Sequence, residues 1–315
     1  MQANEQKYTQ DVAVVIVNFK TPSETIECIT SLVNSEQDIF KRARIIIVDN
    51  GSGDFSLDRL KNFYPYIEVI HLPDNLGFAG ANNYAIRLAL QEPVKYVFLL
   101  NNDTIVLPDA IRQLVETFET NEKAGIVGAT ILRSLNPNII DNMGADIDFY
   151  SGVGKLKKNG ARYDPKLPLQ DVDFASGAAM MIKREVINNI GLLPDFYFLY
   201  CEEMDYCLRA KKSGFKVIIT PNARIIHKTS STLKKFPGIK NYYFHRSRFI
   251  FLRLHASKIQ TFIAFMHSIL VIFPQAAIEY GKKKNMKIAF GEISNFLYGV
   301  LDGICLKTGA TKKVN

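Results

Sequence analysis

An alternation of mainly apolar runs with amphipathic segments is the feature that most constrains the fold of this chain. The apolar runs occupy residues 12–17, 44–48, 67–70 and 95–100. Runs of this kind are typical of strands that helices cover on both faces. Segments with a helical period separate them, and strands that alternate with helices predict an α/β fold with a mostly parallel central sheet.

The segment after the first run shows the helical period clearly. Its apolar residues share one stripe, which comprises Ile26, Ile29, Leu32 and Val33. Ser23 precedes this stripe, and its hydroxyl is suited to accept a hydrogen bond from a backbone amide of the first turn. We therefore predict a helix that Ser23 caps and that packs against the sheet through its stripe.

Polar residues follow the fourth apolar run, where Asn101, Asn102 and Asp103 end the predicted strand. Ligands of open parallel sheets bind just beyond the carboxyl ends of the strands. A carboxylate at this place can hold a divalent cation that steadies a charged leaving group. An ordinary turn is the alternative, because asparagine and aspartate are frequent turn residues.

A second acidic cluster opens a predicted helix at Glu202, Glu203 and Asp205. Acids at the start of a helix and bases at its end would also suit a simple surface helix, because they complement the helix dipole. The aromatic run at residues 196–200 favours a functional role, since apolar walls desolvate a carboxylate and raise its pKa towards that of a useful base. We predict a general base in this cluster.

The glycine-rich segment 77–83 lies at the start of another predicted helix. Glycine there lets backbone amides approach a phosphate or a sugar closely. The segment does not match the dinucleotide-binding fingerprint, because the glycine spacing differs and Asp49 precedes the glycines instead of following them. Tight packing of the helix on the sheet is the alternative role for these glycines.

Five short motifs occur in a fixed order along the chain. They are VDNGS at 48–52, NLGFAGAN at 75–82, LLNND at 99–103, SGAAMM at 176–181 and LYCEEMD at 199–205. Together they resemble inverting glycosyltransferase family 2, and most of all its rhamnosyltransferase-like branch, over about residues 11–255. The resemblance implies a GT-A fold and transfer of a sugar from a nucleotide diphosphate with inversion at the anomeric carbon.

The resemblance also implies roles for individual residues. Asn18, Phe19 and Asp49 take the places that hold the base and ribose of the nucleotide. Asp103 takes the place of the carboxylate that binds Mg²⁺ or Mn²⁺ on the diphosphate. His227 takes the place of a further metal ligand, with a partly buried histidine at a strand end as the alternative.

Glu203 takes the place of the general base that removes the proton from the acceptor hydroxyl. The other expected donor-binding residues are Gly77, Gly80, Asn82, Asn83 and Asn102. The candidates for the acceptor site are Glu202, Asp205 and Tyr200. An apolar lid or sugar platform is expected from the aromatic residues Tyr197, Phe198, Tyr200, Tyr242, Tyr243 and Phe244, for which core packing is the alternative.

Two motifs depart from the family pattern. The usual Asp-x-Asp has Asn101 in place of its first acid, which removes one carboxylate from the cation site and weakens it, because hard cations prefer charged oxygens. The usual Glu-Asp reads Glu202-Glu203, one methylene longer at the base. A binding or regulatory protein that has lost catalysis is therefore the alternative function.

Processive polymerisation is not expected. Processive synthases of the family carry a Gln-x-x-Arg-Trp motif, and this chain contains no Trp.

We expect residues 1–240 to form the GT-A catalytic domain, with a nucleotide-binding half at about 11–103 and an acceptor half at about 104–240. Residues 241–315 are expected to be a helical extension. Within it, 259–278 carries no Asp, Glu, Lys or Arg, but polar residues and a proline interrupt it. These interruptions favour a helix in a membrane interface or packed on the core over a membrane span.

Composition narrows the expected partners and location. The net charge of +8 suits contact with an anionic membrane surface, whereas no recognised motif supports nucleic acid as a partner. The four cysteines form no metal-ligand pairs, so we expect a reduced, cytoplasmic protein. Residues 1–10 are polar, so we expect no signal peptide. The net charge further suggests a peripheral position on the inner face of the membrane. The resemblance implies a dTDP- or UDP-linked sugar, foremost dTDP-rhamnose, and a glycan or polyprenyl-diphosphate-linked acceptor in cell-surface polysaccharide synthesis; another nucleotide sugar is the alternative.

Overall fold

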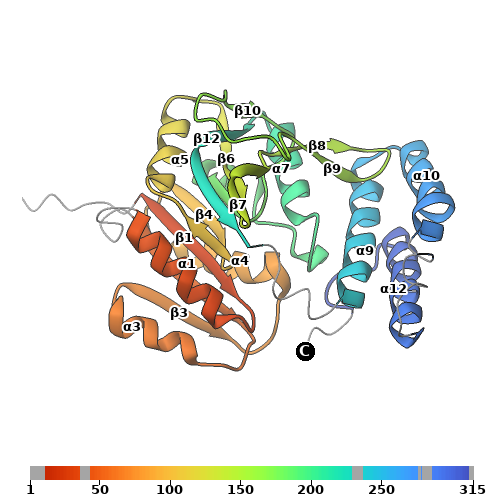
Figure 1. Ribbon diagram of the computed structural model, residues 1–315, viewed down its shortest axis with the longest axis horizontal. Coiled ribbons are helices and arrows are strands. Elements are labelled where there is room, and N and C mark those ends of the chain that lie inside the picture. Colours follow the sequence, from red (N-terminus) through yellow and green to blue (C-terminus); the bar gives the residue numbers. More distant parts are fainter. Residues whose placement is uncertain (1–10, 36–42, 229–236, 276–277, 279–285, 312–315) are drawn as a thin grey trace, which may run out of the picture.

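The computed structural model describes residues 11–35, 43–228, 237–275, 278 and 286–311 (Figure 1). Ten strands of the described residues form one twisted sheet in the order β10-β12-β6-β11-β4-β1-β2-β3, with β5 paired to β12 and β7 to β6. The strands are β1 (Val12–Asn18), β2 (Ala43–Asn50), β3 (Ile67–Leu72), β4 (Tyr96–Asn101), β5 (Thr104–Val106), β6 (Ala124–Arg133), β7 (Asn136–Asn142), β10 (Gln170–Asp171), β11 (Ala179–Lys183) and β12 (Lys216–His227). A separate hairpin joins β8 (Ala145–Asp148) to β9 (Val153–Leu156).

The central sheet is mostly parallel, as the alternation of strands and helices predicted. Strands β3, β2, β1 and β4 run parallel, and so do β6 and β12. The short strand β11 lies antiparallel between β4 and β6. In the parallel register Asn18 pairs with Asp49, and Val17 pairs with Asn101. The carboxyl ends of β1, β2 and β4 therefore meet at one edge of the sheet.

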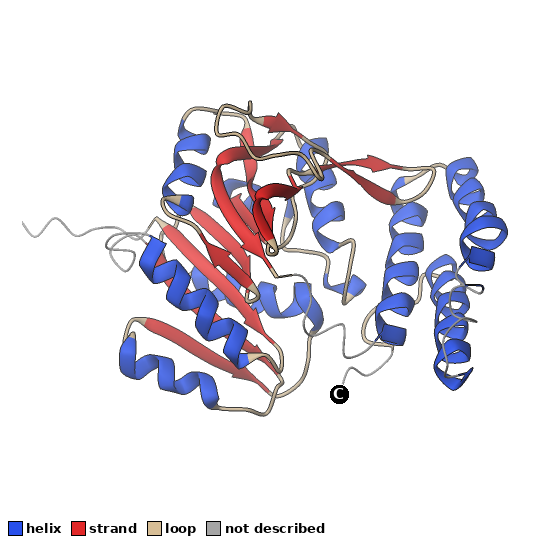
Figure 2. Ribbon diagram, in the orientation of Figure 1, coloured by secondary structure: helices blue, strands red, loops and turns tan. Residues whose placement is uncertain are grey.

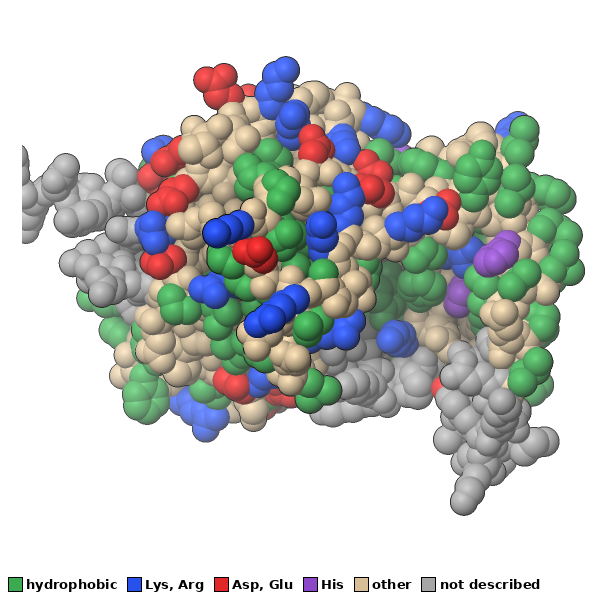
Figure 3. Space-filling model, turned by 45° about the horizontal axis from the view of Figure 1, so that its top comes forward, with side chains coloured by type: hydrophobic (Ala, Val, Ile, Leu, Met, Phe, Trp, Pro, Cys, Tyr) green, Lys and Arg blue, Asp and Glu red, His purple; other side chains and the backbone are tan. Residues whose placement is uncertain are grey.

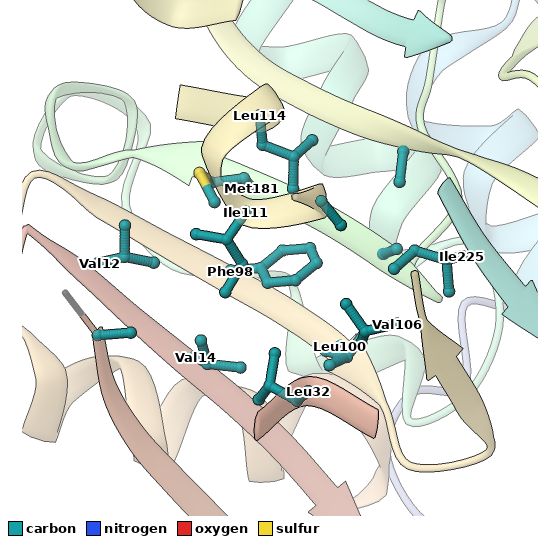
Figure 4. Close-up of a cluster of buried hydrophobic side chains, with 14 of the residues drawn as sticks. Val12, Val14, Leu32, Phe98, Leu100, Val106, Ile111, Leu114, Met181 and Ile225 are labelled. Carbon is teal, nitrogen blue, oxygen red and sulfur yellow. The ribbon is translucent and has the colours of Figure 1, made fainter. Parts of the chain in front are cut away.

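Helices cover both faces of this sheet. Along β1, Val12 and Val14 point into one core, with α1 (Pro22–Ser35) and α5 (Ala110–Glu119), while Ala13 points into the other. That second core contains side chains from α4 (Gly77–Ala89), α6 (Arg184–Ile190) and α7 (Glu202–Lys212). Figure 4 shows the first core, where Phe98 lies between strand and helix side chains. Burial on both faces explains why the apolar runs lack polar alternation.

The predicted helix after β1 is present, but its predicted cap is wrong. Helix α1 begins at Pro22, so Ser23 lies inside the first turn. The fixed φ of proline suits the first helical position, and its missing N–H would have had no partner there. Of the predicted stripe, Ile29 and Leu32 are fully buried, and Ile26 and Val33 pack at the margin of the same core.

The C-terminal part is a helical bundle attached to the α/β layers, visible as the strand-free end in Figure 2. It comprises α9 (Pro237–His255), α10 (Lys258–His267), η3 (Ser268–Ile272) and α12 (Met286–Ile304). The expected boundary at 240/241 lies within α9. The backbones of α9 and α12 approach each other closely at Gly299 and Gly303. A Cβ atom at either glycine would lie only 2.5 Å from a carbonyl oxygen of α9. Within the described part of the chain, every helix falls short of what a membrane crossing requires in length or apolar character.

Candidate active site

A cavity of about 410 Å³ lies at the carboxyl ends of the parallel strands. This size is ordinary for a small-molecule site. The predicted residues that line it are Phe19, Gly77, Asn82, Asn102, Asp103, Tyr200, Glu202, Glu203 and His227. The acid that follows β4 and the two acids that begin α7 therefore lie in one cavity, as the predicted chemistry requires.

A second hollow of about 550 Å³ adjoins the first and shares Phe19 and Asn75 with it. Asp49 lines this hollow together with Phe55 and His71. The rings of Phe55 and His71 lie 4.7 Å apart between centroids. The hollow therefore offers an aromatic surface beside a carboxylate, which suits a planar heterocycle that carries hydrogen-bond donors.

Asp49 is held from two sides. Asn18 Nδ2 donates a hydrogen bond of 2.7 Å to Asp49 Oδ1, and His71 Nδ1 lies 3.4 Å from Asp49 Oδ2. The other ring nitrogen of His71 lies 3.2 Å from Asp58 Oδ1. Asn18 is only 1% exposed and lines neither cavity, so it acts by orienting Asp49. His71 was not predicted, because no motif in the sequence marks the end of β3.

Asn102 links the end of β4 to α1. Its Nδ2 donates hydrogen bonds of 2.8 Å and 2.9 Å to the hydroxyl oxygens of Thr21 and Thr25. An amide can donate these bonds, whereas an ionised carboxylate can only accept. Asn102 therefore has a structural role through these two hydrogen bonds, and it also lines the cavity.

Asp103 and His227 meet although 124 residues separate them. Strand β5 pairs with β12 in a register that sets His227 opposite Thr104, and His227 Nε2 lies 3.0 Å from Asp103 Oδ1. Among the described residues no group of three or more His, Cys, Asp or Glu side chains forms a ready metal cluster. One carboxylate oxygen and one imidazole nitrogen fit a divalent cation that takes its other ligands from diphosphate oxygens and water.

The loop before α7 is strained and closely packed. Phe198, Tyr200 and Cys201 have φ values of 65°, 67° and 69°, which non-glycine residues adopt rarely. Gly77, with φ of 75°, packs against this loop, where an added Cβ would lie 2.3 Å from the Phe198 carbonyl oxygen. The amide of Phe78 donates to that same oxygen at 2.9 Å. Gly77 is therefore needed for close packing against the loop, as well as lining the cavity.

Glu202 and Glu203 begin α7 and both line the first cavity, together with Asp103 and His227. Within the described residues, Oε2 of neither side chain has a hydrogen-bond partner. Burial raises the pKa of both carboxyls above the ordinary value, and the charge of Glu203 raises that of Glu202 further. A buried carboxylate with an open oxygen is suited to take a proton from a bound hydroxyl.

Besides Asn18, three predicted site residues line neither cavity. Asp205 accepts hydrogen bonds from Arg209 at 2.7 Å and from Tyr197 at 3.0 Å, and its Oδ2 lies 2.6 Å from His255 Nε2. Burial alone would raise the pKa of Asp205, but the bonds from His255 and Arg209 outweigh it and lower the pKa. Asp205 therefore ties α7 to α9, and its carboxylate is engaged by these partners outside the cavity.

Asn83 and Gly80 are the other two. Asn83 is 2% exposed and forms paired hydrogen bonds of 2.8 Å and 3.0 Å with the backbone of Leu193. Gly80 faces Leu76, whose Cβ would lie 2.9 Å from an added Cβ. Asn83 therefore ties α4 to the backbone at Leu193, and Gly80 leaves room for Leu76 at the start of the same helix.

Two residues that the sequence analysis did not assign to the site also line the first cavity. Asn50 holds the start of α4, because its Oδ1 accepts from the Leu76 amide at 2.8 Å and its Nδ2 donates to Asn75 at 3.0 Å. Lys240 on α9 is the only lysine or arginine of the described lining. An ammonium group there would offset the charge of a bound diphosphate.

The buried pair of glutamates predicts a pH-dependent stability. Because the folded-state pKa of Glu202 is raised, the folded protein binds this proton more tightly than the unfolded chain, and stability falls as pH rises through the raised pKa. The Glu202→Gln variant does not suffer this loss of stability. The loss amounts to about 1.4 kcal/mol for each unit by which burial raises the pKa. Calorimetry should find a higher melting temperature for the variant at pH 8 and little change at pH 4. The exposed Glu122→Gln serves as control, and an unchanged melting temperature of Glu202→Gln at pH 8 would contradict the prediction.

Comparison with known sequences supports the family resemblance of the motifs. A sequence model of glycosyl transferase family 2 matches residues 13–191, which is more than half of the chain. The low-salt glycan biosynthesis hexosyltransferase Agl10 of Haloferax volcanii is 24% identical over 98% of this chain and 96% of its own. The dTDP-rhamnosyl transferase RfbF of Shigella flexneri is 26% identical over 76% and 82%. The N-acetylglucosaminyl-diphospho-decaprenol L-rhamnosyltransferase of Mycobacterium tuberculosis is 23% identical over 66% and 74%.

Comparison with solved structures supports the fold. GalNAc-T7 with UDP, GalNAc and Mn²⁺ superposes with a TM-score of 0.61 at 14% identity, over 95% of this chain and 57% of that one. Neighbours of this kind are GT-A glycosyltransferases, and the GT-A fold implied by the sequence motifs is confirmed.

Proposed function

The chain belongs to glycosyl transferase family 2, and we propose that it transfers L-rhamnose from dTDP-rhamnose, with inversion and one sugar at a time, to a glycan or lipid-linked glycan. The observation that carries this proposal is one cavity lined by the Asp103–His227 pair and by Glu203. A leaving diphosphate needs positive charge near it, and an acceptor hydroxyl needs a base. Both needs can be met inside this cavity.

The residues have separate tasks in the proposed reaction. The hollow beside Asp49 and Phe55 takes the nucleotide base, and Lys240 faces the diphosphate. Asp103 and His227 would hold Mg²⁺ or Mn²⁺, which when bound neutralises charge on the leaving diphosphate. These assignments place the donor across the two adjoining hollows.

The chemistry itself is a single displacement at the anomeric carbon. The acceptor oxygen forms the new bond to this carbon while the bond from the carbon to the diphosphate oxygen breaks. Glu203 takes the hydroxyl proton, and the diphosphate leaves with the bonding electrons. The aromatic loop residues Phe198 and Tyr200, which line the cavity, limit the entry of water that would hydrolyse the donor.

The choice of rhamnose and of acceptor rests on similarity. RfbF is named for dTDP-rhamnosyl transfer, and the Mycobacterium tuberculosis relative is named for L-rhamnosyl transfer to a diphospho-decaprenol carrier. By extension we place this enzyme at the cytoplasmic face of the membrane, in cell-surface polysaccharide synthesis, acting on a polyprenyl-diphosphate-linked glycan. A different dTDP- or UDP-linked sugar remains the second candidate, because Agl10 is named only as a hexosyltransferase.

A donor panel tests the proposal. The enzyme is incubated with dTDP-rhamnose, dTDP-glucose, UDP-glucose or UDP-galactose, with Mn²⁺ or with EDTA, and with a synthetic polyprenyl-diphosphate-linked acceptor. We expect transfer from dTDP-rhamnose that requires the cation, and NMR of the product should show the inverted anomer. If only a UDP-linked sugar were transferred, that sugar would replace dTDP-rhamnose as the assigned donor. Nucleotide binding without any transfer or donor hydrolysis would favour the alternative of a binding protein.

A further inference from the structure

The outer side of α10 and η3 is apolar and exposed. Ile259 is 72% exposed, Phe262 62% and Leu270 64%, and Ile263 lies beside them. These four residues, here called the α10 face, recur at helical spacing and so share one side of the segment. Figure 3 shows hydrophobic side chains gathered at the edge of the molecule that the bundle forms.

The α10 face is not the side that the bundle needs for its own core. The opposite side of the segment supplies Ala264 and Ser268, which are fully buried against α9 and α12. Arg248 on α9 donates to Ser268 Oγ at 3.0 Å and so fixes η3 to the bundle. The segment is therefore apolar on two sides, and only one of them is used inside the described chain.

Charge distinguishes between the partners that could cover the α10 face. Residues 256–291 carry five lysines and a single acidic residue, Glu279. Lys258 begins α10 and is exposed beside Ile259, and α10 and η3 contain no acid. In a symmetric dimer through this face, Lys258 of each copy would approach the other with no acid of α10 or η3 to offset it, which costs energy. An anionic surface instead complements it.

We propose that the α10 face docks on an anionic lipid bilayer, with its apolar side chains at the boundary of head groups and acyl chains. Basic amphipathic helices that expose large apolar residues bind in this way, through apolar burial and attraction to anionic lipid. The purpose of docking rests on the proposed function, because it would bring the enzyme to a lipid-linked acceptor. The docking itself requires no catalytic residue.

Vesicle flotation tests the docking. The full-length enzyme is mixed with phosphatidylcholine vesicles that contain or lack phosphatidylglycerol, and floated at low and high salt. We expect flotation only with the anionic vesicles and less of it at high salt. Phe262→Ser/Leu270→Ser should weaken binding by on the order of tenfold or more. The control Phe63→Ser/Leu135→Ser removes two even more exposed apolar side chains elsewhere and should float like the wild type.

Three results would overturn the proposal: wild-type protein that stays at the bottom of the gradient with anionic vesicles, full flotation of Phe262→Ser/Leu270→Ser, or a wild-type dimer in sedimentation that this variant abolishes. The last would assign the face to a second copy of the chain. Glu203→Gln should float normally. Flotation without any transfer activity would refute only the proposed function, and transfer without flotation only the docking.

Discussion

Glu203→Gln is expected to slow sugar transfer strongly while leaving donor affinity nearly unchanged. The substitution keeps the shape of the side chain but removes its capacity to take a proton. Loss of a positioned base typically costs on the order of 10²-fold or more in turnover. Calorimetry with the donor nucleotide and steady-state transfer rates, measured on the same preparation, separate binding from chemistry.

The pH profile provides a second readout of the same residue. Glu203 acts as a base only when ionised, and burial raises its pKa. Activity should therefore fall on acidification at a higher pH than an ordinary glutamate would give. Near-normal transfer by Glu203→Gln, together with a collapse in Glu202→Gln, would move the base to Glu202. The matched variant Asp205→Asn tests structure instead, because Asp205 lies outside the cavity and holds α7 to α9.

The fold was predictable where local pattern and tertiary environment agree. Strands β1, β2 and β4 are buried on both faces, so their composition alone marks them, and their parallel pairing follows from the helices between them. The antiparallel insertion of β11 was not predicted, because a five-residue strand has no distinctive period. The pairing of β5 with β12 was not predicted either, since no local pattern specifies a contact across more than a hundred residues.

The site was predictable only as far as residue type distinguishes roles. Asp103 and Glu203 both line the cavity, as their motifs implied. Asp205 belongs to the same motif as Glu203, and Asn83 ends the glycine-rich segment, but Asp205 forms a buried ion pair and Asn83 binds buried backbone. Sequence cannot tell an amide or carboxylate that faces a cavity from one that faces other parts of the protein. Lys240 escaped prediction because α9 reaches the cavity from outside the motifs.

Helix α9 connects the two ends of the molecule physically. Arg246 donates to the carbonyl of Tyr197, and Ser247 Oγ donates to that of Leu199 at 2.7 Å, so α9 holds the strained loop that leads to Glu203. On its other side, Phe249 packs in the core with α10 and α12. The helices that we propose to dock on lipid thus pack on the same helix that holds the loop before Glu203. The C-terminal extension is therefore part of the site's support.

Asp103→Ala is expected to remove most metal-dependent donor binding. Asp103 is the one carboxylate that the changed Asn-Asn-Asp motif retains, and the imidazole of His227 is the second ligand that we propose beside it. A single neutral imidazole holds a hard cation weakly, so the loss of charge should affect donor binding and leaving-group stabilisation together. We expect Mn²⁺-dependent affinity for the donor nucleotide to disappear and turnover to fall by on the order of 10²-fold or more.

The control for this variant is Asp146→Asn, because Asp146 is half exposed in the β8–β9 hairpin and forms a surface pair with Lys157, which contributes little to stability. Titration calorimetry with and without Mn²⁺ is the decisive measurement. If Asp103→Ala bound the nucleotide with unchanged Mn²⁺ dependence, the cation would have to lie elsewhere, and the role of His227 would fall with that of Asp103. If affinity were lost equally with and without Mn²⁺, Asp103 would contact the nucleotide directly.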